Sequence, residues 1–135
     1  MSFKAKLYYN KAFKNMQKED YKNAIEYFKK SFDDYSQDLS FLYNFALCHY
    51  QNKDYADCIN LVDKIIGIDD SYEDAVNLKA SCLVYMGKYC EAESCLNDFL
   101  EKYNGSQSLL NHKNEIEMMC EMSKKGRIQV SINRK

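Results

Sequence analysis

A 34-residue period is the feature of this sequence that most constrains its fold. A small residue recurs three times at this spacing, and so does a tyrosine nine positions further on. A second small residue and a large apolar residue repeat at the same offset. The columns are Ala12, Ala46 and Ala80; Tyr21, Tyr55 and Tyr89; Ala24, Cys58 and Ala92; and Phe28, Val62 and Leu96. Four matched columns in three copies predict a repeat protein, in which each unit packs on its neighbours.

Each unit contains two helical patterns separated by a short break. In the second unit, apolar residues from Leu42 to Tyr50 follow the i, i+3, i+4, i+7 spacing of one helix face. After Asn52-Lys53-Asp54, a second stripe of the same kind runs from Tyr55 to Ile66. The chain has no proline and only four glycines, so the frequent turns of a β-sandwich are not expected. The predicted fold class is all-α.

Several residues mark the expected ends of these helices. Asp20 and Asp54 stand just before a second helix, where a carboxylate can accept unpaired amide hydrogens and offset the helix dipole. Ser71-x-x-Asp74 is similar to a capping box at the start of the third unit. Gly87 is expected in a turn, and Gly105 is expected to end a helix in the left-handed conformation.

This pattern resembles the tetratricopeptide repeat, whose A-x3-F signature is matched by Ala24-Ile25-Glu26-Tyr27-Phe28. The resemblance covers repeats at about 5–38, 39–72 and 73–106, and it implies a right-handed α-solenoid of three helix-turn-helix units. The last unit would expose an apolar face, so a capping helix is expected at about 107–125. Residues 1–125 are therefore expected to form a single domain.

The resemblance also implies a concave groove lined by the first helix of each unit. Its lining would be rich in aromatic and amide side chains, which offer rigid contact area and can pair with a peptide backbone. Whether each tyrosine lines the groove or completes the core remains open at this point. The candidate groove residues are Tyr9, Asn10, Phe13, Tyr43, Asn44, Leu47, Tyr50, Asn77, Leu78 and Tyr85, and the same columns include Lys6, Gln17, Gln51 and Ser81.

Charge is distributed unevenly along the chain. Residues 1–122 contain 14 lysines and arginines against 20 acids, a net charge of −6. The tail at 126–135 contains basic residues and no acid. An acidic body repels phosphates, so a nucleic-acid partner is not expected. The tail is expected to be flexible, or to lie against the acidic body of its own or a neighbouring molecule.

Neither metal nor cofactor chemistry is indicated by the remaining residues. The six cysteines form no C-x2-C pair, and the two histidines have no zinc-finger spacing. The preferred interpretation is that the cysteines are reduced and pack as small hydrophobic residues. No phosphate-binding loop or nucleophile motif is present, so the chain is not expected to be an enzyme.

The start of the sequence has no signal-peptide pattern, and no stretch is long and apolar enough for a membrane span, so a cytoplasmic protein is expected. The predicted function is a non-catalytic protein-interaction module, an adaptor or chaperone-like scaffold that binds an extended or helical peptide. The alternative is a structural assembly subunit that self-associates through its groove and tail.

Overall fold

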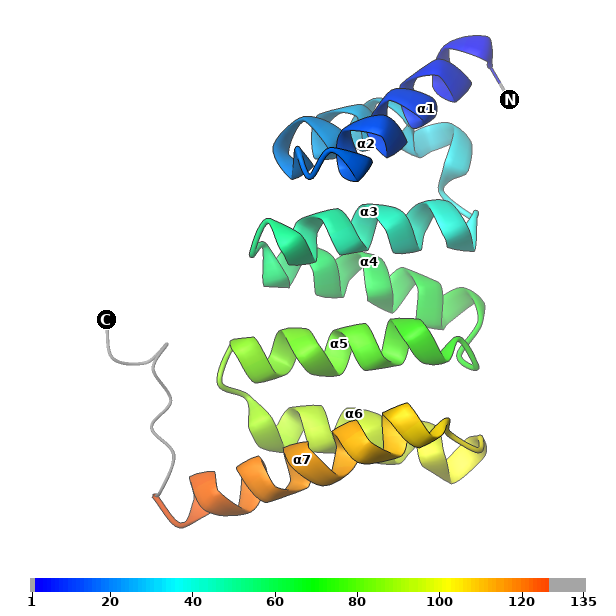
Figure 1. Ribbon diagram of the computed structural model, residues 1–135. Helices are drawn as coiled ribbons and strands as arrows, with labels where there is room; N and C mark the ends of the chain where they lie inside the picture. The colour runs from blue at the N-terminus through cyan, green and yellow to red at the C-terminus, as the bar shows by residue number, and fades with distance from the viewer. Residues whose placement is uncertain (1, 127–135) are drawn as a thin grey trace. The chain divides into compact units, whose positions relative to one another are not determined.

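The computed structural model describes residues 2–126, and secondary structure in this part of the chain is entirely helical (Figure 1). The chain forms two compact units that divide between Ile68 and Asp69. Among residues 2–126, none of the helices combines the length and the apolar character needed to cross a bilayer.

The first unit contains two helical pairs built on the predicted columns. Its helices are α1 (Phe3–Gln17), α2 (Tyr21–Tyr35), α3 (Leu39–Gln51) and α4 (Tyr55–Ile68). Each helix packs against the next along the chain. The small residues Ala12, Ala24, Ala46 and Cys58 are fully buried, as expected where short side chains let helix backbones approach.

Aromatic rings fill the core of the first unit. Phe28 and Phe41 are fully buried, with ring centroids 5.3 Å apart in an edge-to-face arrangement. Phe45 stacks on Phe28 at 5.2 Å, and Tyr35 stacks on Phe41 at 5.0 Å. Such pairs add specific geometry to the burial of large apolar area. This cluster ties α2 to α3, and so joins the first helical pair to the second.

The turns inside the three repeats share one backbone conformation. Glu19, Lys53 and Gly87, which are 34 residues apart, all have positive φ, at 62°, 63° and 78°. In each turn the next residue donates its amide hydrogen to the carbonyl four residues before the positive-φ residue, as in Asp54 to His49 at 2.8 Å. The prediction of a turn at Gly87 is confirmed.

The second unit contains α5 (Glu73–Tyr85), α6 (Tyr89–Lys102) and α7 (Gln107–Lys124), and α6 packs against both α5 and α7. Two acidic side chains at or just before the start of α5 contact the end of α6 and the start of α7. Glu73 accepts hydrogen bonds from the amide and the hydroxyl of Ser106, at 2.8 and 2.5 Å. Asp70 accepts from the Tyr103 hydroxyl and from Lys102, and these bonds lower the pKa of its carboxyl group. The first turn of α7 is therefore held by polar contacts.

The helix ends agree with the sequence in part. Asp20 caps α2 as predicted, accepting from the Asn23 amide at 3.3 Å. The capping box at Ser71 was wrong: Tyr72 precedes α5 without a side-chain cap, because the Ser71 hydroxyl donates to Asp69 instead. The left-handed conformation at Gly105 was also wrong. Its φ is not positive, and a Cβ there would lie 2.9 Å from the Cδ2 atoms of Leu100 and Leu109, so a larger residue would require these side chains to move.

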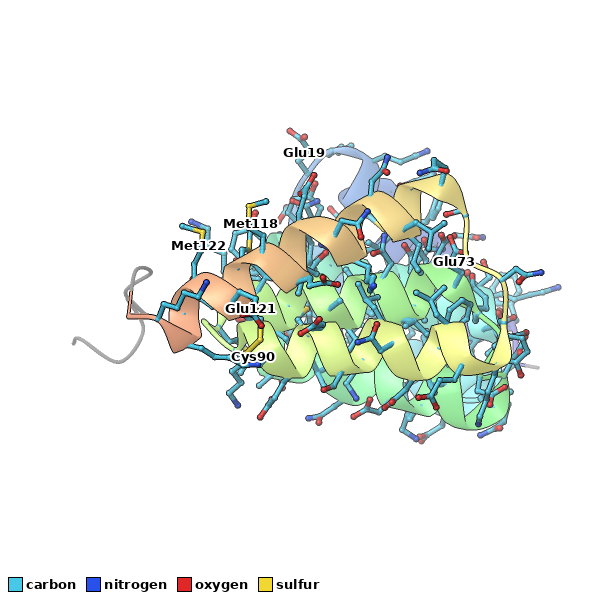
Figure 2. All side chains as sticks on the ribbon, turned by 90° about the horizontal axis from the view of Figure 1, so that it is seen from below. Glu19, Glu73, Cys90, Met118, Glu121 and Met122 are labelled. Carbon is cyan, nitrogen blue, oxygen red and sulfur yellow. A yellow bond between two sulfur atoms is a disulfide. The ribbon has the colours of Figure 1, made fainter. Side chains whose placement is uncertain are left out.

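Two of the six cysteines are bonded to each other. Cys90, in the first turn of α6, forms a disulfide with Cys120 of α7, and their Cα atoms are 4.8 Å apart (Figure 2). The interpretation of every cysteine as a reduced packing residue was therefore wrong for this pair. It holds for Cys48, Cys58 and Cys82, which lie outside this disulfide and are fully buried. The pairing depends on how α7 lies across α6, which the repeat pattern does not specify.

Candidate peptide-binding surface

A shallow depression lies along α1, the first helix of the first unit. It has a volume of about 420 Å³ and is lined by Tyr9, Asn10, Phe13, Lys14 and Gln17. Because these residues recur three, four and seven positions apart, they share one side of the helix. The first-unit candidates Tyr9, Asn10 and Phe13 are thus brought together, and the lining combines two aromatic rings with two amides and one ammonium group.

Tyr9 belongs both to this surface and to the core. Its ring lies 4.8 Å from the ring of Tyr35 and 5.0 Å from that of Phe41, in edge-to-face contacts. The side chain is half-buried, whereas Asn10 is exposed and Phe13 is 40% exposed. Tyr9 therefore both lines the depression and completes the core, the two roles that the sequence left open for the tyrosines. Its ring is held in place by these contacts, so this part of the depression is rigid.

The candidate residues of α3 are only partly accessible. Tyr43, Asn44, Leu47 and Tyr50 are all half-buried. The Tyr50 ring also lies 5.9 Å from that of Tyr55, at the start of α4. These side chains keep part of their surface open, which is the property that a binding residue needs.

The candidate groove residues of α5, in the second unit, differ in exposure and in hydrogen bonding. The Asn77 amide oxygen accepts a 2.5 Å hydrogen bond from Nδ1 of His112 on α7. Leu78 is buried, and Tyr85 is 61% exposed. Burial lowers the pKa of His112, since a cationic ring loses hydration there. Helix α7 therefore already uses one of the predicted groove amides.

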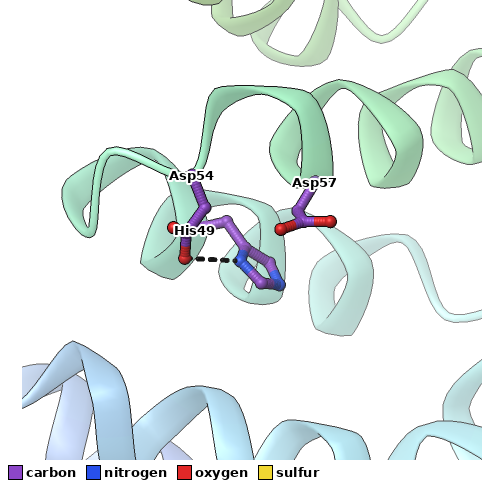
Figure 3. Close-up of side chains that lie close together, drawn as sticks. All are labelled: His49, Asp54 and Asp57. Carbon is purple, nitrogen blue, oxygen red and sulfur yellow. Dashed lines mark hydrogen bonds and ion pairs between the residues drawn. The ribbon is translucent and has the colours of Figure 1, made fainter.

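Three side chains bring together atoms of the kind that bind metal ions. His49, Asp54 and Asp57 bring a ring nitrogen and two carboxylates within 4.8 Å of one another at the turn between α3 and α4 (Figure 3). The Asp54 carboxylate accepts hydrogen bonds from His49 at 3.2 Å and from Asn52 at 2.8 Å, which lower its pKa. His49 is buried and stacks on Phe45 at 5.1 Å. These contacts join His49, Asn52 and Asp54 across the turn between α3 and α4.

Lys14 is part of the depression but was not predicted. Its position one helical turn after Asn10 was the available signal, since residues four apart on a helix lie side by side. The predicted contact of the tail at 126–135 falls almost entirely outside the described residues.

Comparison with known proteins identifies the repeat. The family model described as anaphase-promoting complex, cyclosome, subunit 3 matches residues 17–99, more than half of the chain. The chain belongs to this family of tetratricopeptide repeats. A sequence search of curated proteins gives no match.

Solved tetratricopeptide domains have the same fold. The first such domain of Spaghetti (RPAP3), bound to the HSP90 peptide SRMEEVD, has a TM-score of 0.74 at 20% identity, covering 87% of this chain and 94% of that chain. For the Sgt2 domain from Aspergillus fumigatus the TM-score is 0.77 at 14% identity, with coverages of 95% and 86%. The Yersinia enterocolitica type III secretion chaperone SycD, in complex with a peptide of the translocator YopD, has a TM-score of 0.72 at 21% identity, with coverages of 95% and 98%. The fold class is therefore an all-α helical-repeat solenoid, as predicted.

Proposed function

We propose that this tetratricopeptide protein is a non-catalytic interaction module that binds an extended or helical peptide segment of another protein. In the first unit, the contact surface consists of α1, with Tyr9, Asn10 and Phe13, and α3, with Tyr43, Asn44, Leu47 and Tyr50. In the second unit, the exposed ring of Tyr85 is the most accessible of the candidate side chains.

The depression on α1 is the observation that carries this proposal. It is open, about 420 Å³ in volume, and lined by apolar and polar groups together. Binding sites for peptides combine apolar contact area with a few polar groups that fix orientation. Because the Tyr9 ring is already packed against Tyr35 and Phe41, a ligand would lose little free energy in ordering it.

Similar structures support a peptide as the ligand class. The Spaghetti domain was solved with an HSP90 peptide, and SycD with a peptide of a translocator. A domain of yeast Sti1 is described in complex with Hsp70, at 21% identity and a TM-score of 0.68. These ligands belong to those proteins, and the identity of the partner of this chain is not implied by them.

A peptide-array screen followed by solution binding tests the proposal. The wild-type chain selects peptides, and the affinity of each is then measured for the Tyr43→Ala and Asn44→Ala variants. Removing a half-buried contact residue should weaken binding by about tenfold, which corresponds to about 1.4 kcal/mol.

Asn60→Ala is the matched control, because Asn60 is an exposed amide on α4, the second helix of its repeat. This variant should bind like the wild type. If Tyr43→Ala and Asn44→Ala also bind with unchanged affinity while remaining folded, α3 is not part of the binding surface.

A further inference from the structure

Three large apolar side chains of α1 are exposed to solvent and do not contribute to the core of the first unit. Phe3 is 83% exposed, Leu7 is 41% exposed and Phe13 is 40% exposed. These three belong to a group of only six large apolar side chains that are exposed among residues 2–126. With the exposed polar residues between them they form the α1 strip, defined as Phe3, Lys6, Leu7, Asn10, Phe13 and Lys14.

The charge of α1 is opposite to that of the rest of the body. Its 15 residues contain Lys4, Lys6, Lys11 and Lys14 and no acid, whereas residues 1–122 have a net charge of −6. All four lysines are exposed. Lys11 lies over the Tyr27 ring at 5.6 Å, on the side of α1 that faces α2. Lys6 and Lys14 lie within the strip, so a ligand on the strip meets positive charge beside apolar groups.

At the N-terminal end of α1, this charge pattern disfavours the helix that carries it. Lys4 and Lys6 lie near the N-terminus of α1, where the helix dipole is positive, and the first turn has no acidic residue. The compensation visible at this end is the Ser2 side chain, which accepts from the Ala5 amide, and Asp34, which accepts from the Ser2 amide at 2.9 Å. A partner that brings carboxylates to this side would offset the repulsion. Departures from local stability rules are expected where a surface serves binding.

We propose that the α1 strip docks an acidic, amphipathic helix of a partner protein. Phe3, Leu7 and Phe13 contact the apolar face of that helix, and Lys6 and Lys14 pair with carboxylates along its edges. The chain's own tail is not this occupant, because it is basic. The proposal rests on the proposed function in treating α1 as a contact surface, and it adds the charge and the conformation of the ligand.

A designed peptide tests the proposal directly. The probe is a helical peptide of about 18 residues, five turns long, with leucines at i, i+3, i+4 and i+7 and glutamates elsewhere. Both ends are blocked, so that binding through a terminal carboxylate is excluded. The comparison peptide has the same leucines and has lysine in place of every glutamate. Fluorescence anisotropy with the full chain should show the acidic peptide binding at least about tenfold more tightly, with an affinity that falls as salt is raised.

Variants of exposed residues identify the surface without disturbing the core. Leu7→Ser and Lys14→Glu should each weaken binding of the acidic peptide by about fivefold or more. Lys22→Glu, an exposed charge change on α2, should leave binding unchanged.

Three results would each overturn the proposal: equal affinity for the acidic and basic peptides, absence of saturable binding by the acidic peptide, or unchanged binding by Leu7→Ser and Lys14→Glu. Tyr43→Ala separates this surface from the α3 contact. If that variant loses array-selected peptides but keeps the acidic probe, the strip and the α3 contact are distinct sites.

Discussion

Three residues in equivalent turns have left-handed backbone, and only Gly87 is suited to it. Glu19 and Lys53 adopt positive φ although their Cβ atoms oppose that conformation. We predict that Gly87→Ala destabilises the protein by about 1 kcal/mol, and that Lys53→Gly leaves stability equal or raises it by up to about 1 kcal/mol. Urea denaturation measures both changes. Gly67→Ala is the control, since a Cβ at Gly67 meets no atom within 4 Å. Equal losses for Gly87→Ala and Gly67→Ala would contradict the turn assignment.

His112 gives the protein a stability that depends on pH. Burial lowers its pKa below the ordinary value of 6.5, so the folded chain favours the neutral ring. As pH falls from about 7 to about 5, the unfolded chain binds the proton first, and the free energy of unfolding decreases. Urea denaturation across this range should show a steeper loss in the wild type than in His112→Gln, which retains a donor for Asn77. Parallel pH profiles for the two proteins would contradict this role of His112.

At the scale of helices, α7 depends on few buried residues. Leu109, Ile116 and Cys120 are its buried positions. The contacts of Ser106 and His112 lie in its first half, whereas the disulfide to Cys90 lies near its end (Figure 2). The second half is therefore fixed mainly by Ile116 and by the covalent bond.

Breaking the disulfide should loosen α7. A bond that closes a loop of about 30 residues stabilises a folded chain by about 3.6 kcal/mol through the reduced entropy of the unfolded chain. Addition of a reductant should lower the thermal midpoint of the wild type, and the Cys120→Ser variant should begin at the lower value and not respond to reductant. Buried Cys48 offers no competing thiolate, because burial raises its pKa to about 12. A wild type whose thermal midpoint is the same with and without reductant would contradict this account.

At the scale of the whole molecule, the repeat columns predicted the helical units because each column has one packing role. Ala12, Ala24 and Ala46 are small where helices touch, so identical spacing implies identical contacts. Features that occur once in the chain and depend on one hydrogen bond or one helix contact were harder to predict from the sequence. Ser71 has a hydroxyl that can cap a helix or bind Asp69, and its sequence context does not decide between them. The Cys90 to Cys120 bond required the position of α7 on α6.

The candidate surface was predictable in type and only partly in detail. The resemblance to the tetratricopeptide repeat implies that Tyr9, Asn10 and Phe13 share one surface of α1, and the structure gives them a common depression. The resemblance does not reveal that Leu78 is buried or that His112 already binds Asn77, because both depend on packing in the second unit. The exposure of Phe3 and Leu7 is likewise set by packing around α1 and is not visible in the repeat pattern.

Hydrogen exchange of the full chain, with and without a saturating array-selected peptide, tests the central claim most directly. The account predicts that the peptide slows amide exchange in α1 and α3, the first helices of the repeats in the first unit, and leaves α2 and α4 nearly unchanged. Protection concentrated in α2 and α4, or no protection in the first unit at all, would contradict it.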